Sequence, residues 1–333
     1  MKESDIRPQD LFNKYLELSR QDINTFFSDK SGFMSSDCPA CGSNSSTPAF
    51  VKLGFSYVTC VTCESLYLSP RPTPEMMDDY YDRSAAVKFW GTDFYRQTAG
   101  ARRAAMFRPR AELVSSLSVE YGLGNSFTFA DVGAGYGLFL EEVRDLGVAG
   151  SITAIEPAPN LATICRDRGF AVIEAPLERI SPGEAEVSCA TAFEVLEHVS
   201  SPRDFMAGFK NILEPGGIGL ITTLTCSGFD IRALNEHAKA VYPPYHINLI
   251  SVEGMRRLID RAELELIKLE TPGKLDVDIV RNSLLNDAKI DVGSFERWIA
   301  LEASESQRNA FQSFLAENLM SSHIRIIIRR PAV

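Results

Sequence analysis

The chain has 333 residues, of which 45% are hydrophobic and 23% charged, and its formal net charge is -10. This composition is that of an ordinary globular protein, and the length suits one large domain with a small accessory module. The acidic charge argues against nucleic acid as a partner, because such affinity depends largely on Lys and Arg side chains that neutralise phosphates. No apolar stretch reaches the roughly 18 residues of a membrane-spanning helix, and no secretory signal is evident, so we expect a cytoplasmic protein with no membrane partner.

The first part of the chain is expected to form a helix and then a small module. Within residues 1–33, apolar side chains recur at near-helical spacing from 9 to 27, which predicts a helix. Residues 34–72 have a short β-like pattern rich in Ser, Thr and Pro, and the proline-containing end of this segment cannot continue a helix. We therefore predict a separate module at 34–72.

A helical connector is expected at 73–125. Its clearest helical stretch, 97–122, is interrupted at Pro109, because proline lacks the backbone N–H that a helix interior requires. Gly122 and Gly124 follow and are typical of the end of a helix. These signals predict two helices that lead into the main domain.

From 126 to 333 the pattern changes to short apolar runs that alternate with amphipathic segments. This alternation is typical of an α/β doubly wound, Rossmann-like fold with a parallel sheet between helices. Two later strands, at 263–270 and 323–330, flank a mostly helical insert at 271–321, a candidate lid over a ligand site. The earlier strands are expected at 127–133, 152–157, 170–175, 187–193 and 217–224.

Four of the seven cysteines form two C-x2-C pairs in the predicted module, Cys38 with Cys41 and Cys60 with Cys63. The spacing matches a structural zinc site, and four thiolate ligands leave no coordination position for a substrate. The alternatives are iron bound by the same ligands and four buried cysteines without a metal. Between residues 34 and 70 the chain has one Lys and no Arg, so this module lacks the positive charge needed to bind nucleic acid.

The sequence DVGAGYG at 131–137 follows a predicted strand and begins a predicted helix. Gly133, Gly135 and Gly137 allow a sharp turn close to a ligand, although a purely structural turn would use the same residues. Glu156 ends the next strand, where a carboxylate can accept hydrogen bonds from both hydroxyls of a ribose. Turn and acid together predict an adenosine-containing ligand. The glycine spacing differs from the G-x-G-x-x-G of dinucleotide-binding proteins, which favours a ligand without a pyrophosphate.

With IEP at 155–157, FEVLEHVSSP at 193–202 and LEPGGIGLITT at 213–223, this turn resembles the class I S-adenosylmethionine-dependent methyltransferases. The resemblance covers about 126–270 and implies the fold of that class, with the strand at 323–330 returning as part of an antiparallel hairpin. It also implies S-adenosyl-L-methionine as the methyl donor.

The same resemblance assigns positions around the donor. The turn would hold its methionyl part, the acid after the second strand its ribose, the loop after the third strand its adenine, and the end of the fourth strand would lie beside the methyl group. In chain order these positions are Asp131, Gly133, Ala134, Gly135, Tyr136 and Gly137 in the turn, Glu156 and Pro157 at the ribose, Pro176 and Leu177 at the adenine, and Phe193 and Glu194 at the methyl group.

The cysteine module carries a second resemblance. Its sequence, from CPACG at 38–42 to CESLYLSPRPTPE at 63–75 and then YY, is similar to the zinc-binding leader of bacterial methyltransferases that modify sugars. This implies a structural Zn²⁺ that braces one wall of the acceptor site, and a sugar or nucleotide-linked sugar as the small-molecule acceptor. Glu64 and Ser65 replace the usual glycine after the second cysteine pair.

Methyl transfer to a sugar hydroxyl or to a carbon beside a carbonyl requires removal of a proton, which a positioned base accelerates. His246, in a proline-rich loop after the fifth strand, is the leading candidate, and the alternative is a histidine that only orders this loop. In the resembling sugar C-methyltransferases a glutamate precedes this histidine, whereas Tyr245 stands here, which argues against C-methylation and leaves O-methylation open. His198 and Glu197 belong to the family signature and are candidates for catalysis or for anchoring the fold.

Arg102, Arg103, Arg108 and Arg110 cluster ahead of the main domain. Such a run most often forms a solvated helix face, but guanidinium groups also suit the diphosphate of a nucleotide-linked sugar. Both interpretations predict that these side chains lie on the connector.

The sequence as a whole predicts a methyltransferase that modifies a sugar-type small molecule by O- or C-methylation. One alternative is a ribosomal-RNA methyltransferase with a zinc module, against which the acidic charge argues. The other is a non-catalytic protein that binds S-adenosylmethionine. No oligomeric state is predicted.

Overall fold

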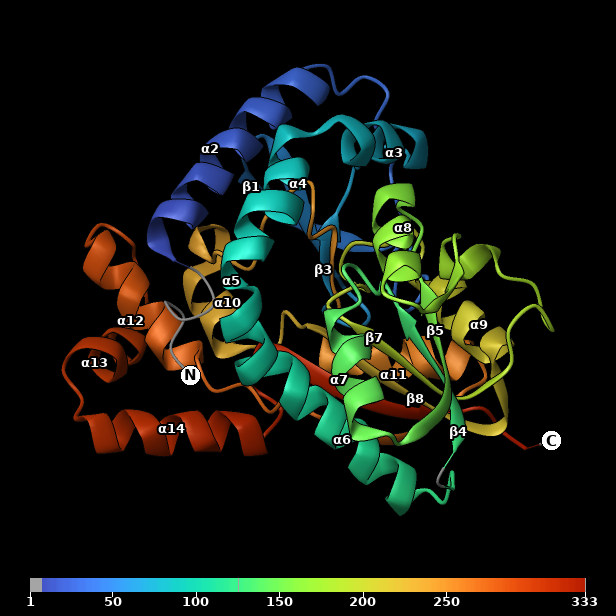
Figure 1. Cartoon of the computed structure of the whole chain (residues 1–333). Coiled ribbons are helices and arrows are strands. Elements are labelled where there is room, and N and C mark those ends of the chain that lie inside the picture. The colour runs from blue at the N-terminus through green and yellow to red at the C-terminus, as the bar shows by residue number, and fades with distance from the viewer. Residues whose placement is uncertain (1–7, 125, 333) are drawn as a thin grey trace. The chain divides into compact units, whose positions relative to one another are not determined.

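The computed structural model describes residues 8–124 and 126–332. Residues 1–7 of the predicted N-terminal segment, 125 of the predicted connector and 333 of the main domain lie outside the described residues. The chain forms two compact units, Met1–Ser35 with Pro70–Pro176, and Ser36–Ser69 with Leu177–Val333. They carry the predicted α/β Rossmann-like fold, with mostly parallel strands between helices and an antiparallel last strand (Figure 1).

One buried carboxylate joins the first helices of the first unit. Asp22 accepts hydrogen bonds from the Ser84 hydroxyl at 2.5 Å and from the Ala86 amide at 2.8 Å. Ser84 ends helix α3 and caps helix α4, so the carboxylate fixes the junction between them. The bounds are Gln9–Phe26 for α2, Pro74–Arg83 for α3 and Ala85–Phe89 for α4. The helix predicted at 9–27 is confirmed by α2.

Helices occupy most of residues 74–120, where the connector was expected, and a π-helical turn interrupts the α-helical pattern directly before Pro109. Helix α5 passes into a π-helical turn, η2, and another π-helical turn, η1, precedes α5. Pro109 occupies the first turn of α6, and Phe107 and Arg108 before it have helical backbone angles. The helix therefore continues here, with a change from π-helical to α-helical hydrogen bonding. The bounds are Trp90–Phe94 for η1, Tyr95–Arg102 for α5, Arg103–Phe107 for η2 and Arg108–Glu120 for α6.

Parallel strands complete the first unit. Strand β5 pairs in parallel with both β4 and β6, and helices α7 and α8 connect them. Because these strands share a direction, the loops that follow β4 and β5 lie at the same edge. The bounds are Phe127–Val132 for β4, Leu138–Leu146 for α7, Ala149–Ile155 for β5, Pro159–Asp167 for α8 and Ala171–Ile173 for β6.

In the second unit, β7 pairs in parallel with β8, and β11 runs antiparallel to both β8 and β10. The alternating side chains Ile324, Ile326 and Ile328 of β11 are fully buried, as the period of a strand requires. The predicted antiparallel return of the last strand is confirmed. The bounds are Leu177–Arg179 for the short helix η3, Val187–Phe193 for β7, Pro202–Ile212 for α9, Leu213–Leu224 for β8, Val252–Arg261 for α11, Glu265–Glu270 for β10 and His323–Arg329 for β11.

The cysteine module, residues 36–69 and called the cysteine ribbon below, forms an antiparallel sheet in the order β1-β2-β3-β9. Strands β1 (Ser46–Lys52), β2 (Phe55–Cys60) and β3 (Leu66–Leu68) belong to the ribbon, whereas β9 (Asn248–Leu249) comes from the loop after β8. This pairing of distant segments was not predicted.

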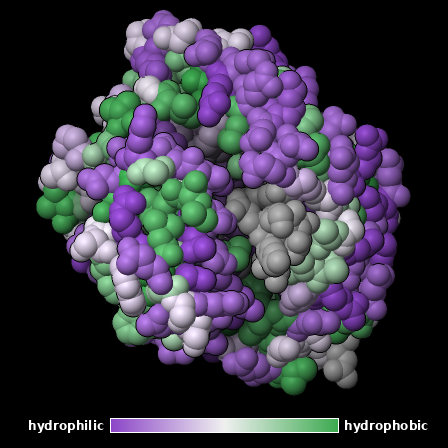
Figure 2. Space-filling view, turned by 90° about the vertical axis from the view of Figure 1, so that its left-hand side faces the viewer, coloured by the Kyte–Doolittle hydropathy of each residue, from purple (hydrophilic) through white to green (hydrophobic). Residues whose placement is uncertain are grey.

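The predicted helical insert is confirmed as α12, α13 and α14. Asp276 fixes it, because its carboxylate accepts hydrogen bonds from the Ser322 amide at 2.7 Å and from the Gln312 side chain at 2.7 Å. Hydrophobic residues lie in small groups among hydrophilic ones on the face drawn in Figure 2. The bounds are Phe229–Leu234 for α10, Asn235–His237 for η4, Asp276–Asn286 for α12, Ser294–Leu301 for α13 and Glu305–Glu317 for α14. Within 8–124 and 126–332, no helix is both long and apolar enough to cross a membrane.

Candidate functional site

The glycine-rich turn lies between β4 and α7, in the first unit. Gly133, Gly135 and Gly137 have φ angles of 71°, 56° and 70°, a region that residues with a side chain rarely adopt. At Gly137 a Cβ atom would also lie 3.3 Å from the Cys165 sulfur, so a side chain there would be crowded as well as strained. Gly137 caps α7 without a side-chain acceptor, which leaves the first amides of α7 for a ligand.

Glu156 ties this turn to the end of β5. Its Oε2 accepts a hydrogen bond from the Gly135 amide at 2.8 Å, and its Oε1 accepts one from the Ala158 amide at 3.0 Å. Each carboxylate oxygen has a second lone pair, so the group retains capacity for the hydroxyls of a ligand. Burial raises the pKa of Glu156, and the two amide hydrogen bonds oppose this shift. The acid predicted to bind a ribose thus lies in hydrogen-bonding contact with the glycine-rich turn.

The other predicted donor-site residues of the first unit differ in burial. Asp131 and Ala134 are buried, Pro157 is exposed, and Pro176 is half-buried. The Tyr136 ring stacks on Tyr95, with centroids 4.6 Å apart, and its hydroxyl donates a hydrogen bond to the Gly91 carbonyl. Tyr136 thus fastens the turn to the helical connector.

The arginine cluster is already engaged within the first unit. Arg103 forms ion pairs with Glu141 and, at 2.6 Å, with Glu142. Arg108 pairs with Glu112 at 3.1 Å. Arg102 is buried beneath the rings of three aromatic residues, with its guanidinium carbon 5.4 Å from the Trp90 centroid. These contacts favour a structural role over binding of a diphosphate.

In the second unit, Glu194 follows β7 with a φ of 59°, an uncommon conformation for a residue with a side chain. Its Oε1 accepts hydrogen bonds from the Thr222 hydroxyl at 2.7 Å and from His323 Nε2 at 3.0 Å. His323 was not predicted as a site residue. Its position opposite Leu224, at the end of β8, follows from the antiparallel register of β11. A prediction of the register between β8 and β11 would therefore have placed His323 near Glu194.

Phe193 and Leu177 flank this region. Phe193, the last residue of β7, is half-buried, and Leu177 in η3 is 2% exposed. A Cβ atom on Gly208 would lie 2.7 Å from Leu177 Cγ, so Leu177 packs closely against α9.

Glu197, His198 and His246 form a second cluster, whose possible metal-ligating atoms all lie within 4.8 Å of one another. The two imidazole centroids are 5.0 Å apart, and Glu197 accepts a hydrogen bond from the Thr223 hydroxyl at 2.7 Å. One carboxylate and two imidazoles at this separation suit either proton transfer or a divalent cation. The loop after β8 thus places His246 beside Glu197 and His198, which follow β7.

Backbone carbonyls fix both imidazole rings of this cluster. His198 Nδ1 lies 3.0 Å from the Tyr245 carbonyl, and His246 Nδ1 lies 2.5 Å from the Ala240 carbonyl. A carbonyl oxygen only accepts, so each Nδ1 carries the proton of that hydrogen bond, and a neutral ring in this tautomer has its lone pair at Nε2. Burial lowers the pKa of His198, although the Tyr245 carbonyl and the charge of Glu194 oppose this shift. Tyr245 contributes its carbonyl, and its side chain is 9% exposed.

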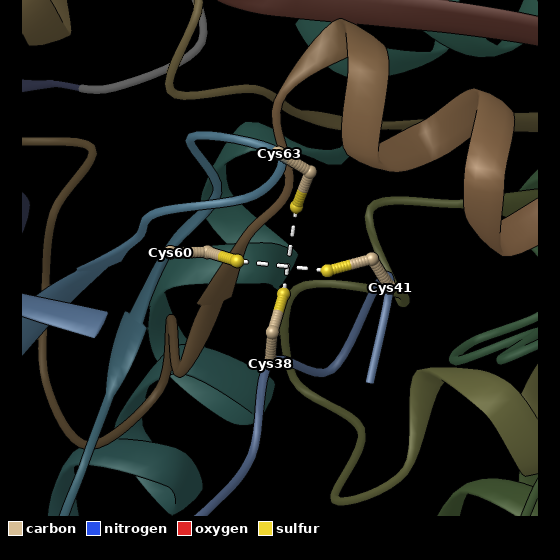
Figure 3. Close-up of side chains that lie close together, drawn as sticks. All are labelled: Cys38, Cys41, Cys60 and Cys63. Carbon is tan, nitrogen blue, oxygen red and sulfur yellow. Dashed lines mark hydrogen bonds between the residues drawn. The ribbon is translucent and has the colours of Figure 1, made fainter. Parts of the chain in front are cut away.

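The sulfur atoms of Cys38, Cys41, Cys60 and Cys63 point toward one centre (Figure 3). Cys38 and Cys63 are separated by 3.5 Å at sulfur, as are Cys41 and Cys60, and the whole set lies within 4.8 Å. A tetrahedral Zn²⁺ with bonds of about 2.3 Å places its sulfur ligands about 3.8 Å apart, so the residues fit this metal. The cluster is consistent with the predicted zinc ribbon.

The environment of the cysteines also suits a negatively charged metal–thiolate centre. Arg261 donates a hydrogen bond to the Ala40 carbonyl at 2.8 Å, between the first two cysteines of the sequence. Its guanidinium group would lie within 2.8 Å of a Cβ atom on Gly42, whose φ is 74°. A cation from α11 therefore lies against the cysteine turn, where it would offset the charge of thiolates bound to a metal.

Comparison with known proteins places these features in a family. Residues 99–269, just over half of the chain, match the family described as Methyltransferase domain. The ubiquinone biosynthesis O-methyltransferase of Roseobacter denitrificans is 27% identical over 157 residues, which are 46% of this chain and 57% of that protein. The enzyme of the same name from Caulobacter vibrioides is 31% identical over 104 residues, 29% of this chain and 40% of that protein. The chain thus spans about half the length of the curated relatives it matches.

Among solved structures, an S-adenosylmethionine-dependent methyltransferase from Mesorhizobium loti is similar with a TM-score of 0.42 and 13% identity. That similarity covers 62% of this chain and 92% of the other.

Proposed function

The chain belongs to the methyltransferase-domain family, and on this premise we propose that it is an S-adenosylmethionine-dependent O-methyltransferase with a small-molecule acceptor. The observation that carries the proposal is the family match itself, because residues 99–269 include the glycine-rich turn, Glu156 and the cluster of Glu197, His198 and His246. The names of the curated relatives support transfer to oxygen.

We propose that the glycine-rich turn and Glu156 hold the donor, which supplies an electrophilic methyl group when bound. The α7 amides and the turn would bind its methionyl part, with Asp131 as support, and Glu156 would accept hydrogen bonds from its ribose. The carboxylate is fixed by the Gly135 and Ala158 amides, so it needs little reorganisation on binding. Phe193, Glu194, Pro176 and Leu177 keep the roles that the sequence resemblance assigns them.

We propose that His246 accepts the proton of the acceptor hydroxyl at Nε2. The Ala240 carbonyl fixes the tautomer that this role requires, since it holds the proton at Nδ1. His198 and the buried Glu197 would steady the imidazolium that forms, because they lie within 4.8 Å at their polar atoms. Tyr245 acts through its backbone carbonyl, which orients His198.

The cysteine ribbon would bind one structural Zn²⁺ through Cys38, Cys41, Cys60 and Cys63. With four protein ligands the metal has no position open to a substrate, so its role is to stabilise the ribbon. The acidic surroundings of the cysteines in the sequence give no support to an RNA-binding role.

Two classes of acceptor remain as proposals. A sugar or nucleotide-linked sugar is the acceptor that the ribbon resemblance implies, but the engaged arginine cluster offers no ready diphosphate site. An aromatic hydroxyl is the second candidate, because the relatives are named for ubiquinone biosynthesis. Both classes have a hydroxyl that His246 can deprotonate.

The test is transfer of label from methyl-labelled S-adenosylmethionine to panels of nucleotide sugars and dihydroxylated aromatic acids. We expect calorimetry to show donor binding and one panel to gain label on oxygen. His246→Asn should lower turnover by roughly 10²- to 10⁴-fold and leave donor affinity unchanged. His237→Asn is the matched control, because this histidine is exposed and lies outside the cluster. A donor that binds while no acceptor is labelled would contradict the proposal.

A further inference from the structure

The histidine loop, residues 238–251, is held by the cysteine ribbon along its whole length. Near its start, Lys52 Nζ donates a hydrogen bond to the Ala238 carbonyl at 2.7 Å. Near its end, the Ser65 hydroxyl accepts one from the Ser251 amide at 3.1 Å. The ribbon therefore contacts both ends of the segment that contains His246.

One ribbon side chain reaches His246 itself. The Tyr57 hydroxyl lies 2.8 Å from the His246 carbonyl, although the two residues are 189 positions apart in the sequence. A carbonyl only accepts, so Tyr57 is the donor. Tyr57 is 1% exposed, and burial raises its pKa well above the usual value, so the hydroxyl keeps its proton. This hydrogen bond is therefore formed in a dry environment at any working pH.

The residues after His246 are hydrogen-bonded on two sides. On one side, the Leu68 amide donates to the Ile247 carbonyl at 3.0 Å, beside the β3–β9 pairing. On the other side, the Ile247 amide donates to the Glu197 carbonyl at 3.0 Å, and the Asn248 side chain donates to the Val199 carbonyl at 2.7 Å. The histidine loop thus lies between the ribbon and the segment that contains Glu197 and His198, and it is hydrogen-bonded to both.

These contacts with the histidine loop are made by residues close to the four cysteines. Cys60 ends β2, the strand that contains Tyr57, and Cys63 accepts a hydrogen bond at its carbonyl from the Ser251 hydroxyl. Strand β1 of the ribbon has no buried residue, whereas β2 and β3 bury Tyr57, Tyr67 and Leu68. A metal would tie the cysteine turns to these buried strands, because its binding energy would contribute to the stability of the ribbon. Loss of the metal would loosen β2 and with it the Tyr57 side chain.

From these contacts we propose that Tyr57 is a positioning residue for His246, and that metal occupancy of the four cysteines sets the geometry of the Glu197, His198 and His246 cluster. The proposal rests on the proposed function, in which His246 is the base. Lys52 and the β3–β9 pairing hold the rest of the loop, so Tyr57 acts on the orientation of one residue.

The experiment compares the zinc-loaded full chain with the zinc-loaded Tyr57→Phe variant. Amide exchange of residues 246–249 should rise at least tenfold in the variant, and the ¹⁵N signals of the His246 ring should show a mixture of tautomers. With the identified acceptor, kcat should fall about tenfold while KM for the acceptor and donor affinity stay unchanged. Tyr67→Phe is the matched control, because Tyr67 is equally buried in the ribbon but pairs its strand with Asn248, not His246.

Metal removal is the second arm and guards against a variant that fails to fold. Chelation of zinc from the wild-type chain should give the same change in exchange and in the His246 ring signals. Unchanged exchange at 246–249 and unchanged ring signals, in the variant or after the ribbon has lost its metal, would overturn the proposal. A wild-type chain that transfers no methyl group but still shows this coupling would refute the proposed function and leave the positioning role intact.

Discussion

The glycine-rich turn and the histidine loop differ in how the sequence specifies them. The turn is formed by seven consecutive residues and by Glu156 at the end of the following strand. The histidine loop takes its position from ribbon residues such as Tyr57 and Ser65, which lie 189 and 186 positions away. A site formed by neighbouring residues, such as the turn, depends little on changes elsewhere in the chain. A site formed by distant segments, such as the histidine loop, depends on the stability of each segment that holds it.

Removal of a metal ligand should separate the two regions most clearly. Cys60→Ala should abolish stoichiometric zinc binding and remove binding energy on the order of 10 kcal/mol from the ribbon. Exchange should then rise in residues 38–68 and in the histidine loop, but not in the glycine-rich turn, as mass spectrometry can measure. Cys189→Ala, a buried cysteine of β7, is the control and should retain one zinc per chain. Equal loosening of the turn would show that the two regions are not independent.

The second unit, which contains the histidine loop, should also have a stability that depends on pH. Burial, followed by the charge of Asp276, raises the pKa of Asp230 to about 7. The folded state therefore binds this proton more tightly than the unfolded state, and stability falls as pH rises from about 4 to 7, by at most about 4 kcal/mol. Asp230→Asn should stabilise the chain at pH 8 and flatten this slope in thermal unfolding.

Asp278→Asn is the control for that measurement, because Asp278 is an exposed aspartate of α12, in the same unit. It should leave the slope between pH 4 and 7 unchanged. An Asp230→Asn variant with the wild-type slope would show that another group titrates there.

Glu156→Gln probes the local site. The amide places an N–H group opposite the Gly135 or Ala158 amide and removes the charge, so donor affinity should fall by about 10- to 100-fold. Calorimetry measures the loss. Glu174→Gln, at the exposed end of the next strand, should bind the donor like the wild type. Thermal stability of the ribbon should not change, since no ribbon contact is lost.

A smaller difference distinguishes backbone strain from crowding within the turn. Gly137 and Gly147 begin and end α7 with φ angles of 70° and 64°, but only at Gly137 would an added Cβ atom lie within 4 Å of other atoms. Alanine at either position should cost about 1 kcal/mol for the left-handed conformation. Gly137→Ala should cost about 1 kcal/mol more, and should weaken donor binding. Equal unfolding free energies for the two variants would contradict this interpretation.

The alternation of strands and helices was predictable because buried strands and amphipathic helices have different periods. The turn from Gly133 to Gly137 and its contact with Glu156 follow from the same pattern, since consecutive parallel strands end at one edge. The interruption expected at Pro109 lies directly before it, because the π-helical turn η2 ends at Phe107 and Pro109 stands in the first turn of α6. That the backbone stays helical through the interruption could not be predicted, since a proline can also end a helix.

The partners of the histidine loop could not be predicted in this way. Strand β9 has two residues, too few for any periodic signal, and its pairing with β3 depends on the folded ribbon.

The partners of the two glutamates could be predicted only from the register of β8. Thr222 and Thr223 are adjacent on β8, yet they bind Glu194 and Glu197 respectively, because neighbouring side chains of a strand face opposite sides.

Strand β1 stands last in the order β1-β2-β3-β9, farthest from the histidine loop strand. Its pairing with β2 shifts register between Pro48 and Phe50, and Pro48 has no N–H to offer a further strand. Such an irregular margin resists addition of a strand from another molecule. We therefore expect this edge to disfavour self-association of the ribbon, which on the proposed role of zinc would matter most before the cysteines bind the metal.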